Sequence, residues 1–205
     1  MRVRSPPGNL CLCSDSKFQQ ATALILGLGA NVAGHWGCPR ETLTRACYEI
    51  EQAGVKIVRR SNYFITKPIS DTPQPPYLNA VILAKACIAP STLLRLLKQI
   101  EVRAGRRTTR PMASRPLDLD ILEHGGRRVG QPSRRRERGR LLLPHPEMYK
   151  RAFVLVPLLQ IAPAWRHLPT GLGAKGLLAQ LSLAERATVR QALDSATNTC
   201  DKLPS

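Results

Sequence analysis

The sequence predicts an α+β fold in which an antiparallel sheet carries helices on one face and further helices are added at the C-terminal end. Two segments repeat apolar residues at helical spacing, and the stretches between them are short apolar runs or alternate as strands do. These segments follow the order strand, helix, strand, strand, helix, strand, and the remaining helical pieces come only after the last strand. The 205 residues suffice for one domain with a hydrophobic core.

The domain is expected to span residues 21–185. Residues 1–20 contain Pro, Gly and Ser and are interpreted as a weakly ordered extension, and residues 186–205 as a C-terminal helix or tail. No apolar run approaches the length of a membrane span, and no secretory signal pattern begins the chain. No cysteine pair has a zinc-ligand spacing. We therefore expect a cytoplasmic protein with reduced cysteines, which are Cys11, Cys13, Cys38, Cys47, Cys87 and Cys200.

The first predicted strand, residues 23–28, is a short apolar run followed by a Gly- and Asn-containing turn at residues 27–31. Residues 39–53 place apolar side chains three, four and seven positions apart, which predicts a helix. Pro39 suits the first helical position, and Gly54 suits the residue that ends the helix.

The middle of the chain predicts two strands and a second helix. Residues 55–66 alternate loosely and are expected to form one strand. Residues 67–76 hold four prolines and must form a loop. Residues 77–88 form a long apolar strand, and residues 89–105 form a helix with an apolar stripe.

The next segment begins with a basic loop at residues 106–114 and continues into a strand at residues 116–122. Residues 151–161 are expected to form a helix that is interrupted or restarted at Pro157, and a short apolar helix begins after Ala174. The resulting βαββαβ order is the ferredoxin-like plan, in which helices cover one face of the sheet and the other face can carry a site.

Two carboxylates lie side by side on the last predicted strand. In the stretch RPLDLDILE, Leu117, Leu119 and Ile121 alternate with Asp118 and Asp120. Residues i and i+2 of a strand lie about 6.6 Å apart on one face, where two carboxylates repel each other unless a positive group lies between them. A Mg²⁺ ion shared with phosphate oxygens would remove this repulsion. The alternative is that both aspartates occupy the solvent face of an amphipathic strand.

Basic residues outnumber acidic ones by 31 to 14, which gives a net charge of +17. This excess favours anionic partners such as nucleic acid, a membrane surface or a phosphorylated small molecule. Residues 127–140, RRVGQPSRRRERGR, hold seven arginines and one acid and are interpreted as a solvated insert. The alternative is a dedicated binding patch, and any nucleic-acid binding through this insert is expected to be nonspecific.

An ordered set of segments resembles the 6-hydroxymethyl-7,8-dihydropterin pyrophosphokinase family of folate biosynthesis. These segments are GLGAN (27–31), YLNA (77–80), IEVRAGR (100–106), RPLDLDIL (115–122) and LPHPEMYKRAFVLVPLLQIAP (143–163). The resemblance implies a ferredoxin-like fold and transfer of the β,γ-pyrophosphoryl group of ATP to the hydroxymethyl oxygen of a reduced pterin, with release of AMP. We also expect a monomer whose partners are these two small molecules and which needs no membrane.

The resemblance also implies roles for individual residues. Asp118 and Asp120 correspond to ligands of two Mg²⁺ ions, and Arg106 and Arg115 correspond to catalytic residues. Residues that correspond to ATP-binding positions are Lys98, Glu101, Arg110, Arg115, Ile121, Arg140, His145 and Arg151. Those that correspond to the pterin pocket are Thr66, Lys67, Pro68, Ile69, Tyr77, Asn79 and Phe153.

The chain departs from the family pattern just before the paired aspartates. Typical members have Trp-Gly-Pro-Arg where this chain has Met112, Ala113, Ser114 and Arg115. A paralogue that acts on a modified pterin, or one with weak activity, is therefore an alternative. A second alternative is a nucleic-acid-binding module, because RNA-binding domains share the ferredoxin-like plan. Such modules carry aromatic residues on their central strands, and the strand at residues 116–122 has aspartates instead.

Overall fold

The computed structural model describes residues 21–68, 73–107, 113–130 and 141–192. The predicted extension at residues 1–20 and most of the arginine-rich insert lie outside these ranges. Three predicted site residues also lie outside them, namely Ile69, Arg110 and Arg140.

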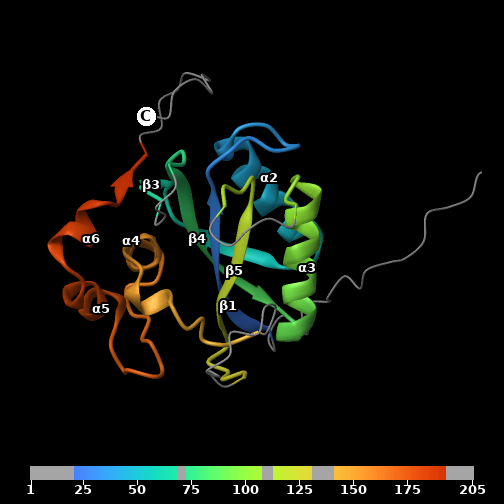
Figure 1. The fold of residues 1–205 in the computed structure, drawn as a ribbon. Helices are drawn as coiled ribbons and strands as arrows, with labels where there is room; N and C mark the ends of the chain where they lie inside the picture. The colour runs from blue at the N-terminus through green and yellow to red at the C-terminus, as the bar shows by residue number, and fades with distance from the viewer. Residues whose placement is uncertain (1–20, 69–72, 108–112, 131–140, 193–205) are drawn as a thin grey trace, which may run out of the picture.

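A six-stranded antiparallel sheet forms the centre of the molecule (Figure 1). Its order is β5-β1-β4-β3-β6, and β2 also pairs with β4. The strands are β1 (Thr22–Ala30), β2 (Lys56–Arg60), β3 (Phe64–Thr66), β4 (Tyr77–Ala86), β5 (Asp118–His124) and β6 (Arg190–Gln191). The antiparallel β5-β1-β4 arrangement confirms the predicted ferredoxin-like fold class.

Helices α2 (Pro39–Gln52) and α3 (Pro90–Arg103) cover one face of the sheet. Both present an apolar stripe to the main core, where Leu43, Ile50, Leu93 and Leu97 are fully buried. Pro39 and Pro90 lie in the first turns of these helices, where the missing N–H removes no helical hydrogen bond.

Helix α4 (Ala152–Ile161) packs on the opposite face of the sheet, against part of β4 (Figure 1). Its buried residues Val154, Leu158 and Ile161 form a second core with Ile25, Val81 and Leu122. The 3₁₀ helix η1 (Met148–Lys150) precedes α4, and α5 (Ala174–Gln180) packs against it. The short helix α6 (Leu183–Ala187) follows. Among the described residues, no helix is both long enough and apolar enough to cross a membrane.

The prediction of a single strand at residues 55–66 is wrong, because the structure divides this segment into β2 and β3. Ser61 lies at the break and is buried, and its hydroxyl accepts a hydrogen bond from the Val81 N–H at 3.0 Å. The next residue, Asn62, donates its N–H to the Gln160 side chain of α4 at 2.8 Å. The Ser61 N–H still donates to the Val81 carbonyl at 3.0 Å, but the Val81 N–H takes a side-chain acceptor and the Asn62 N–H takes a partner outside the sheet. Alternation along the chain reveals neither of these partners.

Two other local predictions also differ from the structure. The expected interruption at Pro157 is not observed, since α4 is one helix with Pro157 inside it. Burial of the apolar α4 side chains on both sides of the proline offsets the lost backbone hydrogen bond. The short strand β6 was not predicted, and it pairs with β3 through two residues.

Candidate active site

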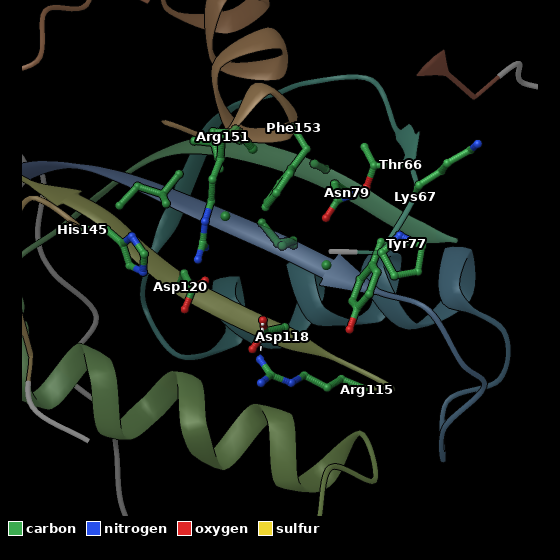
Figure 2. A pocket seen from close by; sticks show the side chains of 18 of the residues that line it. Thr66, Lys67, Tyr77, Asn79, Arg115, Asp118, Asp120, His145, Arg151 and Phe153 are labelled. Carbon is green, nitrogen blue, oxygen red and sulfur yellow. Dashed lines mark hydrogen bonds and ion pairs between the residues drawn. The ribbon is translucent and has the colours of Figure 1, made fainter. Parts of the chain in front are cut away.

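A cavity of about 370 Å³ lies on the sheet face that α4 only partly covers. Strands β1, β4 and β5 provide its floor, and the segments before β4, β5 and α4 provide its walls (Figure 2). Its volume falls in the range of small-molecule sites. The predicted site residues that line it are Thr66, Lys67, Pro68, Tyr77, Asn79, Arg115, Asp118, Asp120, His145, Arg151 and Phe153.

Two glycines of β1 form the centre of the floor, which the predicted turn at residues 27–31 did not anticipate. Gly27 pairs with Asp120 and Gly29 pairs with Asp118, so the glycines lie beside the two carboxylates. A Cβ added to Gly29 would approach the Asn79 Oδ1 to 3.1 Å. The strand continues through these glycines because both of its neighbours, β4 and β5, pair with it. One signal in the sequence could have indicated that these glycines lie in a strand. Gly-Leu-Gly has the same period-2 spacing as Asp-Leu-Asp.

Asp118 is paired with two guanidinium groups. Arg106 binds one carboxylate oxygen, and Arg115 binds the other at 2.8 Å. Burial acts to raise the pKa of Asp118, but Arg115 and Arg106 outweigh it and hold this pKa below its usual range. The carboxylate is therefore ionised and its repulsion with Asp120 is compensated, which answers the electrostatic problem raised by the sequence.

His145 and Arg151 lie on the opposite side of Asp120 from Arg115 (Figure 2). The His145 backbone N–H donates to the Leu122 carbonyl at 2.9 Å, which ties the segment before η1 to the end of β5. The Nδ1 atom of His145 accepts the Glu147 N–H at 3.2 Å, so the neutral ring carries its proton on Nε2. Burial and the nearby Arg151 lower the pKa of His145 against the opposing effect of Asp120.

The other half of the cavity is aromatic and amide-lined. Phe153 reaches it from the first turn of α4 and Tyr77 from the start of β4, and Asn79 lies between them in the view of Figure 2. The Asn79 amide nitrogen donates to the Thr66 hydroxyl at 2.8 Å, and both residues are buried. Together these groups could hold a flat heteroaromatic ring and read one of its edges.

The residues present fit a hard divalent cation shared with a phosphate ligand. Asp118 and Asp120 offer carboxylate oxygens from one face of β5, and both line the cavity. In the ranges that the structure describes, no group of three or more His, Cys, Asp or Glu side chains could hold a metal by itself. This donor set suits Mg²⁺, which commonly takes one or two carboxylates and completes its shell with phosphate oxygens and water.

Of the predicted site residues that the structure describes, four lie outside the cavity lining, namely Lys98, Glu101, Arg106 and Ile121. Ile121 points into the main core on the helix side of β5 and is 3% exposed. Arg106 lies behind the cavity and contacts it through its ion pair with Asp118.

Lys98 and Glu101 of α3 bind the backbone of β5 between the two aspartates. The Glu101 carboxylate accepts the Leu119 N–H at 2.8 Å, and the Lys98 ammonium donates to the Leu119 carbonyl at 3.3 Å. Glu101 also forms ion pairs with Lys98 at 2.7 Å and with Arg106 at 2.8 Å. Burial raises the pKa of Glu101, and these two cations oppose that rise. The pair therefore takes the place of a neighbouring strand along the edge of β5.

Comparison with known proteins gives a consistent picture. A family model described as 7,8-dihydro-6-hydroxymethylpterin-pyrophosphokinase (HPPK) matches residues 25–163. The 2-amino-4-hydroxy-6-hydroxymethyldihydropteridine pyrophosphokinase of Synechocystis sp. is 35% identical over 148 residues, which are 72% of this chain and 70% of that protein. The mitochondrial folate synthesis bifunctional protein of Arabidopsis thaliana is 31% identical over 168 residues, which are 77% of this chain.

Solved structures share the fold. The crystal structure of wild-type HPPK-DHPS from Plasmodium falciparum matches with a TM-score of 0.56 and 14% identity, over 78% of this chain and 43% of that one. The chain likewise spans only 28% of the Arabidopsis bifunctional protein. The similarity to these larger proteins therefore concerns one part of each of them.

Proposed function

The chain belongs to the 7,8-dihydro-6-hydroxymethylpterin-pyrophosphokinase family, whose members are ATP-dependent enzymes of folate synthesis, and we propose that its cavity transfers the β,γ-pyrophosphoryl group of ATP to the hydroxymethyl oxygen of 6-hydroxymethyl-7,8-dihydropterin. The observation that carries this proposal is that one cavity joins two chemically different halves. Paired carboxylates with arginines lie on one side, and two aromatic rings with a buried amide lie on the other.

The aromatic half is proposed to bind the pterin. Tyr77 and Phe153 would contact the two faces of the ring, and Asn79 would hydrogen-bond its amide-like edge. The hydrogen bond from Asn79 to Thr66 supports this role, because it holds the amide in one orientation before the substrate arrives. Lys67, Pro68 and Ile69 are proposed to complete this pocket.

The charged half is proposed to bind the triphosphate. Arg115 and Arg151 both line the cavity and can each bind two phosphate oxygens through a planar guanidinium. His145 can donate from Nε2, because its Nδ1 is already an acceptor. The further nucleotide-binding residues that we propose are Lys98, Glu101, Arg110, Ile121 and Arg140.

Asp118 and Asp120 are the residues that would hold Mg²⁺, and two ions are proposed. Bound together with ATP, such ions would neutralise phosphate charge and acidify the substrate hydroxyl. Arg115 orients the phosphate chain beside Asp118, and Arg106 holds Asp118 from behind the cavity.

The transfer forms a bond between the substrate oxygen and the β-phosphorus of ATP and breaks the bond between that phosphorus and the oxygen of the leaving AMP. The hydroxyl proton leaves to solvent. No covalent enzyme intermediate is required, because positioning and charge stabilisation carry most of this chemistry. The contribution of the protein is therefore the alignment of two substrates above strands β1, β4 and β5.

AMP release from Mg²⁺-ATP, measured with and without 6-hydroxymethyl-7,8-dihydropterin, tests the proposal. We expect pterin-dependent AMP from the wild-type protein and a loss of at least about 100-fold in Asp118→Ala, the scale of removing one group that stabilises transition-state charge. Glu123→Gln is the matched control. Glu123 lies on the same strand but binds Trp165 outside the cavity, so this variant should keep its activity.

A folded wild-type protein that binds ATP without pterin-dependent AMP would contradict this acceptor and favour a paralogue with another substrate. Equal losses in Asp118→Ala and Glu123→Gln would contradict the specific role of Asp118. We also propose a monomeric, cytoplasmic enzyme, and light scattering of the purified protein tests the first of these properties.

A further inference from the structure

Asn31 follows the last residue of β1 and is 1% exposed. It does not line the cavity, and the proposed transfer gives it no role. A buried amide must satisfy its donors and acceptor inside the protein, so its partners are informative.

One set of partners belongs to the segment that leads into Arg115. The Asn31 Oδ1 accepts the Arg115 backbone N–H at 2.7 Å, and the Asn31 backbone N–H donates to the Arg115 carbonyl at 3.1 Å. The Asn31 amide nitrogen also contacts the Ser114 hydroxyl at 3.4 Å. These bonds fix the backbone from which the Arg115 guanidinium reaches Asp118.

The second set of partners belongs to the segment that leads into Tyr77. The Asn31 amide nitrogen donates to the Pro75 carbonyl at 3.2 Å and to the Gln74 side-chain oxygen at 3.3 Å. A proline carbonyl only accepts and the Arg115 N–H only donates, so the orientation of the amide is determined by its partners. Ser114 adds a direct link, because its hydroxyl donates to the same Gln74 oxygen at 3.2 Å.

Asn31 therefore joins the two walls of the cavity from outside it. The wall at Arg115 belongs to the phosphate half and the wall at Tyr77 to the pterin half. The Tyr77 hydroxyl contacts the Ala113 carbonyl at 3.5 Å, which is a second contact between the same two segments. Movement of either wall would disturb the hydrogen bonds of this one buried amide.

We propose that Asn31 is a positioning residue that couples the binding of the pterin to the binding of the ATP phosphates, by holding both walls in one arrangement. This inference rests on the proposed function, because it assigns one substrate to each wall. A ligand that orders one wall then lowers the cost of ordering the other, and each ligand tightens the binding of its partner.

Asn31→Asp keeps the hydrogen bond to one wall and removes those to the other. The aspartate keeps an acceptor for the Arg115 N–H but places an oxygen where the amide nitrogen had donated to Pro75 and Gln74. Asn62→Asp is the matched control, since it adds the same charge at an exposed asparagine.

Titration calorimetry measures the coupling directly. The dissociation constants of Mg²⁺ with a non-hydrolysable ATP analogue, and of 6-hydroxymethylpterin, are determined alone and with the other ligand saturating. In wild type and Asn62→Asp we expect each ligand to tighten the other by about 5- to 150-fold, the usual range of such coupling. In Asn31→Asp we expect a coupling factor within about two-fold of one, while each ligand alone binds within about three-fold of wild type.

Wild-type coupling in Asn31→Asp, or no coupling in the wild-type protein, would overturn the inference. A purely structural role would lower the melting temperature or the binding of each ligand alone and leave the coupling factor of the folded protein intact. If Asn31→Asp does not fold, Ser114→Ala removes the hydroxyl that contacts both Asn31 and Gln74 and should reduce the coupling factor at least two-fold, or the inference fails. Pterin-dependent AMP release by the wild-type protein tests the proposed function separately.

Discussion

At the scale of single residues, the paired aspartates show how charge of one sign is tolerated on a strand. Arg106 and Arg115 each bind one oxygen of Asp118. Gly27 and Gly29 of the neighbouring strand leave the space beside the two carboxylates open. A substrate with phosphate groups can therefore approach both the carboxylates and the arginines, provided that a cation comes with it.

His167 gives a prediction for the dependence of stability on pH. The residue is 3% exposed, and its ring stacks on Tyr149 with 5.3 Å between ring centroids and has its Nδ1 at 3.0 Å from the Thr170 hydroxyl. Burial lowers the pKa of His167, so the unfolded chain binds a proton more readily than the folded one. The contribution of neutral His167 to the free energy of unfolding is therefore fully present above the unfolded pKa of about 6.5. It is lost as the pH falls through the lower pKa of the folded state.

We expect the free energy of unfolding in urea to fall between pH 7.5 and 5.5, and to fall by less in His167→Gln. His145 also has a lowered pKa, but it titrates in both proteins and cancels in the comparison. Identical losses of stability in the two proteins would show that His167 does not contribute.

At the scale of elements, helix α3 supports the site without lining it. Glu101 and Lys98 bind the N–H and carbonyl of Leu119, which lies between the two aspartates on the edge strand. The resemblance assigned both residues to ATP binding, and they remain candidates for it. Their observed hydrogen bonds indicate that they position β5.

Glu101→Ala should lower the free energy of unfolding by about 1–3 kcal/mol, because it leaves the buried Leu119 N–H without an acceptor. It should also lower kcat at least about ten-fold, since a small displacement of the reacting groups is costly. Glu101→Gln keeps an acceptor and should lose less of both. Urea denaturation and AMP release measure the two effects.

Glu49→Ala is the control for this prediction. Glu49 is a similarly buried glutamate on α2 that forms ion pairs with Arg45 and Arg103, away from the cavity. It should lose stability and keep kcat. If Glu101→Ala is destabilised but keeps full kcat, Glu101 serves the fold and not the site.

At the scale of the whole molecule, the net charge of +17 is the property that a nucleic-acid-binding function would use. The open face of the sheet argues against specific RNA recognition. Its edge strand β5 presents two carboxylates, Asp118 and Asp120, to the cavity, and its central strands β1 and β4 present Gly27, Gly29, Asn79 and only one aromatic side chain, Tyr77, among the lining residues. RNA-binding domains of this fold present aromatic residues on those strands to stack bases.

We expect any RNA retention by the full chain to be electrostatic and independent of sequence. If six phosphates are contacted, affinity should fall about a thousand-fold between 50 and 200 mM salt. Filter binding with two unrelated oligonucleotides measures both properties. A strong preference for one oligonucleotide that persists at 200 mM salt would contradict this expectation and revive the RNA-binding alternative.

The sequence by itself determined the fold class, the order of its main helices and strands, and the paired aspartates of the cavity. Periodicity revealed the helices and strands because one face of each is buried, and the pair Asp118 and Asp120 stood out because carboxylates on adjacent same-face positions need a compensating charge. The family resemblance then added most of the remaining cavity wall, including Tyr77, Asn79 and Phe153, which local patterns could not have assigned to one pocket.

Only the tertiary structure decided which residues support that pocket. Gly27 and Gly29 lie in a strand because two neighbouring strands pair with them, and Ser61 ends a strand because its hydroxyl takes over a backbone hydrogen bond. Asn31 finds partners more than 40 residues away in the sequence. Periodicity records which face of an element is buried, but the partner of a polar group across the fold depends on packing that no local pattern contains.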